Sequence, residues 1–166
     1  MENMNSLKIG KVDFIENELF FEEKKSKKIQ EELNPKQPNL NEITIGDKLF
    51  RVGDRVMQTA NNYDKEWIRG IEIGTGVFNG DIGYIEDIYP ATGETIVLFE
   101  DGRRAHYTTI DLDELVLSYA ITIHKSQGSE FDAVIIPISG GNPMMLTRNL
   151  LYTAVTRAWH KGIPLL

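Results

Sequence analysis

The spacing of hydrophobic and polar positions changes twice along this chain of 166 residues. Before residue 43, isolated apolar residues alternate with charged ones. The composition of residues 17–33 predicts a helix with an exposed Lys- and Glu-rich face, and Asn34-Pro35 is a stop signal for it. The polar residues 34–42, which contain two prolines, predict a linker.

From residue 43 to residue 115, short alternating runs are separated by glycine turns. The pairs Gly53-Asp54, Asn79-Gly80 and Asp101-Gly102 divide this stretch into four or five predicted strands. No convincing helix pattern lies between them, which favours a small SH3-like or related β-barrel. The glycine-rich residues 69–80 are expected to form a long mobile loop.

After residue 115, continuous apolar runs replace the alternation. Residues 115–123 and 132–138 each predict a strand that is covered on both faces. A short helix at 125–128 follows the first strand, and a longer one at 147–159 follows the second. This order predicts part of a parallel α/β domain. Pro164 is expected to weaken any central strand at the end of the chain.

The expected fold class is therefore mixed α/β and β. A β-barrel at 43–115 is joined to a partial α/β domain at 116–166. Residues 1–42 are assigned to the same α/β domain as a helical segment with a linker. The barrel is thus expected to be inserted into the α/β domain or appended to it.

Composition excludes several classes of protein. The chain has no cysteine and three scattered histidines, so no metal site is expected. Its apolar runs are far shorter than the roughly 20 residues that span a bilayer, and its start lacks the apolar stretch of a signal peptide. A cytoplasmic protein with no membrane partner is predicted.

The net charge of −7 argues against a protein that coats DNA non-specifically. Residues 1–115 hold 14 basic and 23 acidic residues, whereas residues 116–166 hold 4 basic and 2 acidic ones. Any anion-binding surface is therefore expected in the last third of the chain.

The first candidate site is the stretch "TIHKSQG", residues 122–128. Backbone N–H groups where a strand turns into a helix favour a phosphate. Gly128 allows close approach of a ligand. The same polar residues would also serve simply as a helix cap. The side-chain donors gathered here are Thr122, His124, Lys125 and Ser126.

The second candidate site is Arg157, on the predicted helix 147–159. A guanidinium on a rigid helix can reach a phosphoryl group and stabilise the charge that develops during its transfer. An arginine on an amphipathic helix can equally be a solvated surface residue.

Together these stretches carry a specific resemblance. Residues 119–137, "YAITIHKSQGSEFDAVIIP", and 148–158, "RNLLYTAVTRA", resemble motifs V and VI of superfamily 1 DNA helicases in their RecD-like form, the exodeoxyribonuclease V alpha-chain family. Residues 50–85 are similar to the segment that enters the SH3-like 2B subdomain of these enzymes, and residues 27–38 resemble the stretch just before that segment. The resemblance implies a C-terminal fragment of an ATP-dependent 5′–3′ DNA helicase, with the α/β part as domain 2A.

The resemblance also implies roles for single residues. Arg157 matches the catalytic arginine that reaches the γ-phosphate of ATP. Tyr152, Thr153 and Thr156 would transmit the nucleotide state. Residues expected at the nucleotide are Gln127, Gly128, Glu130 and Arg157. Residues expected at single-stranded DNA are Thr122, His124, Lys125 and Ser126.

Two parts of a motor are missing from the sequence. No glycine-rich loop ends in Lys-Ser or Lys-Thr to cradle phosphates, and the run "DAVIIP" ends in proline where a carboxylate would hold Mg²⁺. ATP and Mg²⁺ are therefore expected only with the complete helicase. This chain alone is expected to bind neither and to be inactive. Its expected partners are single-stranded DNA and the N-terminal helicase domains of the same protein, with nuclease-complex subunits as further candidates.

An alternative is a stand-alone SH3-like module that binds a protein or peptide without motor activity. Its surface would be formed by Tyr63, Trp67, Phe78 and Tyr84, although a core position is the simpler expectation for each of them.

Overall fold

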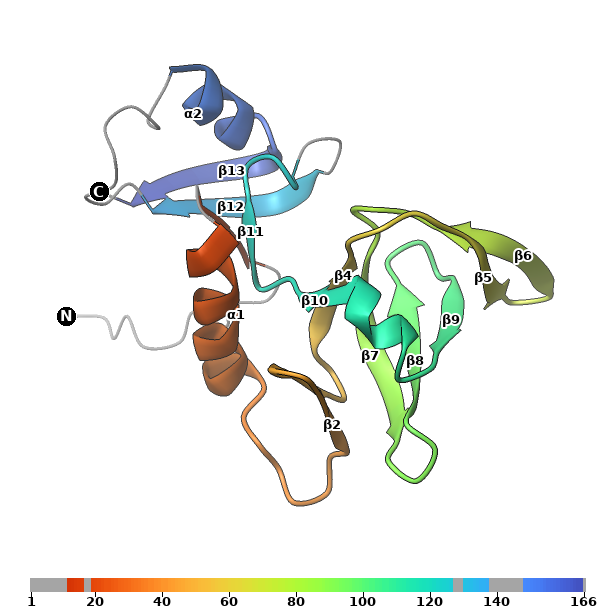
Figure 1. Cartoon of the computed structure of the whole chain (residues 1–166). Coiled ribbons are helices and arrows are strands. Elements are labelled where there is room, and N and C mark those ends of the chain that lie inside the picture. Colours follow the sequence, from red (N-terminus) through yellow and green to blue (C-terminus); the bar gives the residue numbers. More distant parts are fainter. Residues whose placement is uncertain (1–11, 17–18, 127–129, 138–147, 166) are drawn as a thin grey trace. The chain divides into compact units, whose positions relative to one another are not determined.

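The computed structural model describes residues 12–16, 19–126, 130–137 and 148–165. The chain splits into two compact units. The β unit is Phe20–Ala120, and the α/β unit combines Met1–Leu19 with Ile121–Leu166. Figure 1 labels their elements along the chain. No helix among the described residues is long and apolar enough to cross a membrane.

The β unit begins with the predicted helix, α1 (Leu19–Leu33). A two-stranded antiparallel hairpin follows, formed by β2 (Glu42–Ile45) and β3 (Lys48–Arg51). The remaining strands form one antiparallel sheet in the order β10-β4-β7-β8-β9-β5-β6. Their bounds are β4 (Arg55–Gln58), β5 (Asn62–Arg69), β6 (Glu72–Val77), β7 (Ile82–Tyr89), β8 (Glu94–Phe99), β9 (Arg104–Tyr107) and β10 (Leu115–Leu117), with the 3₁₀ helix η1 (Asp111–Glu114) before β10.

The three predicted turns are present. Gly53, Gly80 and Gly102 have φ angles of +89°, +96° and +87°, a region that glycine enters without a steric penalty. They lie between β3 and β4, between β6 and β7, and between β8 and β9. Local turn chemistry thus sets where most of these strands begin.

Alternation along the strands builds the core of the β unit. In β8 every second residue is buried, as the period-2 pattern predicts. Tyr107 is fully buried, and its hydroxyl donates to Oε1 of Gln58 at 2.9 Å. Besides Tyr107, the buried core cluster consists of Phe50, Val56, Val77, Ile85, Ile88, Val97, Phe99, Ala105, Leu112 and Leu115.

The glycine-rich stretch is a hairpin, so the predicted mobile loop is wrong. β5 and β6 pair with Arg69 opposite Glu72, which leaves a two-residue turn at Gly70-Ile71. Gly74 lies under the ring of Trp67, where a Cβ atom would come within 2.5 Å of the indole. The glycines therefore make room for an aromatic ring within paired strands.

The apolar run at 115–123, predicted as one strand, is two strands in different sheets. β10 pairs with β4 of the β unit, whereas β11 (Ala120–Thr122) joins the sheet of the α/β unit. Between them, the Ser118 N–H donates to the Arg55 carbonyl at 2.9 Å, and Arg55 Nη1 donates to the Ser118 carbonyl at 2.9 Å. These bonds hold the chain where the strand is interrupted.

The α/β unit contains a four-stranded sheet in the order β11-β1-β12-β13. β12 (Phe131–Pro137) is the predicted strand and runs parallel to both neighbours, β1 (Val12–Glu16) and β13 (Ala158–Leu165). Helix α2 (Arg148–Val155) contacts β12 and β13 (Figure 1).

Three features of this unit differ from the expectation. β1 was missed because its charged residues suggested a helical segment. Residues 123–126 form a turn rather than the start of the predicted short helix. The second helix ends at Val155 because the chain turns into β13. β13 is the last strand in the order of the described sheet, and an edge strand tolerates the missing N–H of Pro164.

The grouping of α1 also bears on domain organisation. The structure groups α1 with the β sheet, whereas the sequence assigned residues 1–42 to the α/β domain. The predicted boundaries at residues 43 and 116 stay a prediction about the intact protein.

A buried carboxylate joins three segments of the β unit. Asp54 has no exposed surface, and its two oxygens accept hydrogen bonds from four groups. Burial raises the pKa of this carboxyl above its ordinary value, and the hydrogen bonds offset part of that effect. The donors are Nδ2 of Asn34 at 2.7 Å, the backbone N–H of Arg51 at 2.7 Å, the hydroxyl of Tyr119 at 3.0 Å and Nε2 of Gln30.

Replacing Asp54 by alanine should destabilise the protein. The substitution removes one of the two acceptors of the Gln30 and Asn34 amides, which keep the carbonyls of Leu49 and Val52, and it removes the acceptor of the Tyr119 hydroxyl. We therefore expect Asp54→Ala to lower the free energy of unfolding by about 2–4 kcal/mol. Urea denaturation followed by circular dichroism measures this loss. Asp47→Ala is the control, because within the described part of the chain the carboxylate of this exposed residue takes part in no hydrogen bond or ion pair, and the substitution keeps its backbone carbonyl, which accepts from Lys27. Equal midpoints for both variants would contradict the role of Asp54.

Asp54 should also titrate at a higher pH than Asp111. Although partial burial would raise the pKa of Asp111, hydrogen bonds from Lys65 and Thr108 lower it overall. Carboxyl ¹³C NMR should therefore give Asp54 the higher midpoint. The folded-state pKa of Asp54 is raised, so its contribution to stability is present at low pH and lost as pH rises through that pKa. The contribution of Asp111 is lost as pH falls. The reverse order of midpoints would contradict this assignment.

Candidate nucleotide and nucleic-acid interface

The turn after β11 uses part of the predicted donor cluster to hold itself together. The Lys125 N–H donates to Oγ1 of Thr122 at 3.2 Å, and the Ser126 N–H donates to the Thr122 carbonyl at 3.1 Å. The Ser126 hydroxyl donates to the Ile123 carbonyl at 2.7 Å. The side chains of Thr122 and Ser126 are buried and give this turn its shape.

The two remaining side chains of the cluster are more accessible. His124 is exposed and Lys125 is half-buried. A turn whose backbone is fixed from within presents these two side chains without a long flexible loop. They are the groups of this stretch that can reach a phosphate or a base.

The second candidate, Arg157, lies where α2 passes into β13. Its Nε donates to the Thr153 carbonyl at 3.3 Å. The hydroxyls of Thr153 and Thr156 donate to backbone carbonyls one turn earlier, those of Asn149 and Thr153. The last turn of the helix is therefore closed by its own side chains, and Arg157 is positioned on it. Tyr152, in the same turn, is exposed.

The sheet brings Arg157 close to Glu130. The Phe131 N–H, at the start of β12, donates to the Arg157 carbonyl at 2.9 Å. Glu130 directly precedes Phe131 and is exposed. The predicted nucleotide residues Glu130 and Arg157 thus lie at the same end of the β12–β13 pair, although they are 27 residues apart in sequence (157 − 130).

Not every predicted site residue is found at the end of the β12–β13 pair where Glu130 and Arg157 lie. Gln127 and Gly128 lie outside the described residues. The turn at 122–126 follows β11, and β1 lies between β11 and β12 in the sheet order. The donor turn therefore directly follows β11, whereas Arg157 directly precedes β13.

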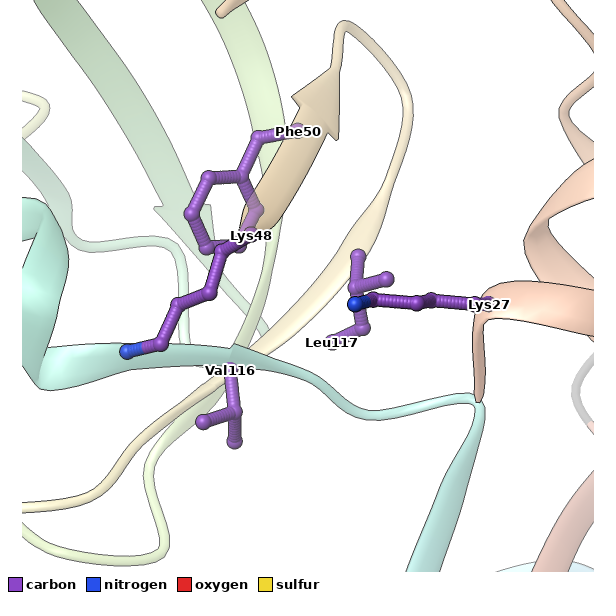
Figure 2. A pocket seen from close by; sticks show the side chains of 5 residues that line it. All are labelled: Lys27, Lys48, Phe50, Val116 and Leu117. Atoms are coloured by element: carbon purple, nitrogen blue, oxygen red, sulfur yellow. The ribbon is translucent and has the colours of Figure 1, made fainter. Parts of the chain in front are cut away.

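A small pocket lies in the β unit. Figure 2 shows the side chains that line it, which come from α1, β3 and β10. The Lys27 ammonium donates to the Asp47 carbonyl at 3.0 Å, and that of Lys48 donates to the carbonyls of Asp113 and Leu115. Its lining is Lys27, Lys48, Phe50, Val116 and Leu117.

This pocket does not provide a phosphate cradle. Apart from its two lysines, its lining is apolar, and both ammonium groups donate to backbone carbonyls. No local pattern in the sequence indicates this pocket, because its residues come from three separate segments. Over the described ranges, no group of three or more His, Cys, Asp or Glu side chains could hold a metal ion.

The aromatic residues of the alternative hypothesis divide into two pairs. Tyr63 and Phe78 are exposed and contact each other edge to face, with ring centroids 5.6 Å apart. Trp67 and Tyr84 are half-buried in the sheet. Part of the predicted aromatic surface is thus accessible.

Two family models match the chain. Residues 27–99 match the SH3 domain of ATP-dependent RecD-like DNA helicases, and residues 117–163 match the C-terminal domain of UvrD-like helicases. The two matched ranges do not overlap, and residues 100–116 lie between them. They confirm the predicted combination of an SH3-like domain with part of an α/β helicase domain.

Curated relatives point to the same family. The chain is 36% identical over 121 residues to the ATP-dependent RecD2 DNA helicase of Deinococcus radiodurans, covering 73% of this chain and 15% of that protein. It is also 36% identical over 107 residues to the RecBCD enzyme subunit RecD of Mycolicibacterium smegmatis, covering 64% of this chain and 17% of the relative. The chain therefore spans less than a fifth of the length of each.

A solved structure shows the same fold. The Pif1 helicase from Bacteroides, in complex with ADP-AlF3 and single-stranded DNA, superposes with a TM-score of 0.65 at 19% identity, covering 100% of this chain and 43% of that one. This likeness supports the fold alone. The two family models and the curated relatives lead to one conclusion: the chain belongs to the RecD-like DNA helicases, of which it represents the SH3 domain and part of the C-terminal helicase domain.

Proposed function

We propose that this chain works as part of an ATP-dependent 5′–3′ DNA helicase, in which it contacts single-stranded DNA and supplies an arginine to the nucleotide. The observation that supports this best is the hydrogen bond from the Phe131 N–H to the Arg157 carbonyl. It ties the start of β12, next to Glu130, to the end of the arginine-bearing helix. The two motifs of the resemblance thereby meet in three dimensions.

At the nucleotide, Arg157 would contact the γ-phosphate and Glu130 would lie towards the ribose. A guanidinium presents a planar fork of N–H donors that matches phosphate oxygens and stabilises the charge that develops during transfer. The closed last turn of α2 limits the conformations of Arg157, so less entropy is lost when it binds. Gln127 and Gly128 complete the proposed nucleotide contacts.

At the DNA, His124 and Lys125 would contact the strand directly. Thr122 and Ser126 would act by shaping the turn, since their side chains are buried and hydrogen-bonded within it. Contacts of this kind position a phosphate backbone and carry little sequence information. DNA binding by this turn is therefore proposed to be independent of sequence.

The complete helicase would supply what this chain does not show. The phosphate cradle and the carboxylate for Mg²⁺ would come from N-terminal helicase domains of the same protein, with ATP and Mg²⁺ bound there. Other subunits of a nuclease complex are further proposed partners, because one relative is named as a subunit of the RecBCD enzyme. A cytoplasmic location fits this activity.

A peptide-binding role for the SH3-like domain is the second candidate function. The exposed Tyr63–Phe78 pair favours it. It is compatible with the helicase proposal, because the two functions use different units of the chain.

Removing the Arg157 guanidinium tests the nucleotide role. In the complete helicase, Arg157→Ala should reduce DNA-stimulated ATP hydrolysis by about 10³ to 10⁵, since arginine fingers contribute rate factors of this size. DNA affinity should stay close to that of the parent. Arg148→Ala, at the other end of the same helix, is the matched control and should leave turnover nearly unchanged. Full turnover in Arg157→Ala would reject the proposal.

Salt-dependent DNA binding tests the proposed contact between the turn at 122–126 and single-stranded DNA. The 166-residue chain should bind fluorescent oligo-dT weakly, and the affinity should fall as salt rises. Lys125→Ala should weaken binding to every sequence and reduce the slope of log K against log salt by about 1. The exposed Lys28, in α1, is the control. If the Lys28→Ala and Lys125→Ala variants lose affinity equally in anisotropy titrations, the contact does not lie at this turn.

A further inference from the structure

β6 forms one edge of the seven-stranded sheet, and within the described part of the chain it pairs only with β5. Arg69 and Glu72 flank the two-residue turn, so they form a hydrogen-bonded pair. The pairing alternates along the hairpin, so the N–H and C=O groups of Ile73 and Thr75 point away from β5. These outward groups are free to pair with another strand.

The open edge is short and has a defined end. Gly76 has a φ of +101°, outside strand geometry, and its carbonyl accepts a hydrogen bond from Arg103 Nη1 at 2.8 Å, so the regular strand edge ends at Thr75. Gly74 pairs inward with Trp67, whose ring lies over it. A partner strand would therefore meet the sheet at Ile73 to Thr75, a length of one or two hydrogen-bonded pairs.

Exposed apolar side chains surround this edge. Ile68 and Ile73 face each other across the hairpin and lie on one face of it, with 46% and 77% of their surface exposed. Ile71, in the turn, is fully exposed, and the Tyr63–Phe78 pair lies at the other end of the hairpin. Three exposed isoleucines beside an open strand edge are unusual, since sheet edges are normally protected by charge or bulges.

The cations and carboxylates of this hairpin differ in whether they are paired. Lys65 is paired with Asp111 at 2.7 Å, and Arg69 is paired with Glu72 at 2.7 Å. Asp64 and Glu66, on the same hairpin, are exposed, and neither carboxylate takes part in a hydrogen bond or ion pair among the described residues. The unpaired charge is therefore negative, which disfavours a nucleic-acid backbone. A second copy pairing through β6 would bring the same carboxylates together.

We propose that β6 is a docking strand for an extended segment of a partner protein that alternates apolar residues with Lys or Arg. Its backbone would add to the sheet at Ile73 and Thr75. Its apolar side chains would pack beside Ile68, Ile71 and Ile73, and its cations would lie near Asp64 and Glu66. This proposal does not depend on the helicase activity.

A capped peptide of sequence KVKVKVK serves as the probe, added to the ¹⁵N-labelled 166-residue chain. We expect saturable shifts of the Ile73 and Thr75 amides, with slower hydrogen exchange at both, and little change at Gly74, whose amide is already paired. The peptide EVEVEVE reverses the charge, and KVKPKVK interrupts the strand with a proline. Both should bind at least tenfold more weakly than KVKVKVK. Equal binding by EVEVEVE would overturn the charge argument.

Two substitutions separate the edge from the apolar surface. Thr75→Pro removes an outward N–H that makes no ladder bond, so it should weaken the peptide roughly tenfold while the fold is kept. Thr75→Ser is its matched control and should bind normally. If Thr75→Pro loses the hairpin signals in the NMR spectrum, Glu66→Gln replaces it, with an expected loss of KVKVKVK affinity of about threefold.

Competing occupants give distinct results. Shifts of Ile73 and Thr75 on addition of oligo-dT would assign the surface to nucleic acid and overturn the proposal. A concentration-dependent dimer in sedimentation, abolished by Thr75→Pro, would assign it to a second copy. Absence of any saturable shift with millimolar KVKVKVK would also overturn it. None of these outcomes depends on the DNA contact at Lys125, which is tested separately.

Discussion

The β unit depends on one buried carboxylate. Asp54 lies in the turn before β4 and accepts hydrogen bonds from α1, from β3 and from Tyr119, 65 residues further along the chain. A buried charge without partners would cost several kcal/mol, so these donors must stay in place for the unit to fold. The same contacts hold Tyr119 just before the chain enters β11. The hydrogen bond to Asp54 therefore fixes the chain at Tyr119, directly before the strand that leads to the candidate turn.

In the candidate site, some polar residues stabilise the local backbone, and others are presented for contact with a ligand. Four donors lie close together in sequence at 122–126, but two of them are used to close the turn. The closed turn then presents His124 and Lys125. Similarly, Thr153 and Thr156 satisfy carbonyls at the end of α2, next to Arg157. Each group proposed to contact a ligand is supported by neighbours that do not contact it.

The two units differ in their chemistry. The α/β unit carries the cations of the last third of the chain, in line with a role at phosphates. The β unit carries most of the acidic residues and presents an apolar strand edge between carboxylates. A helicase segment with these two surfaces could hold DNA through one unit and a protein partner through the other.

Much of this organisation follows from the sequence alone. The glycine turns, the alternation of β8, the end of α1 at Asn34-Pro35 and the apolar run of β12 are local signals, because a turn conformation or a buried face requires particular residues at particular positions. The paired motifs around Thr122 and Arg157 likewise identified the family. These features needed no knowledge of which segments would meet in space.

Other features were decided only by tertiary contacts. β1 has no apolar run of its own and is a strand because it lies between β11 and β12. The glycine-rich stretch became a hairpin because the ring of Trp67 fills the space over Gly74, and the run at 115–123 divided because Arg55 binds Ser118 from another strand. In each case the deciding partner is distant in sequence or on the opposite strand. Local propensity cannot show such a partner, because the contact exists only once the chain has folded.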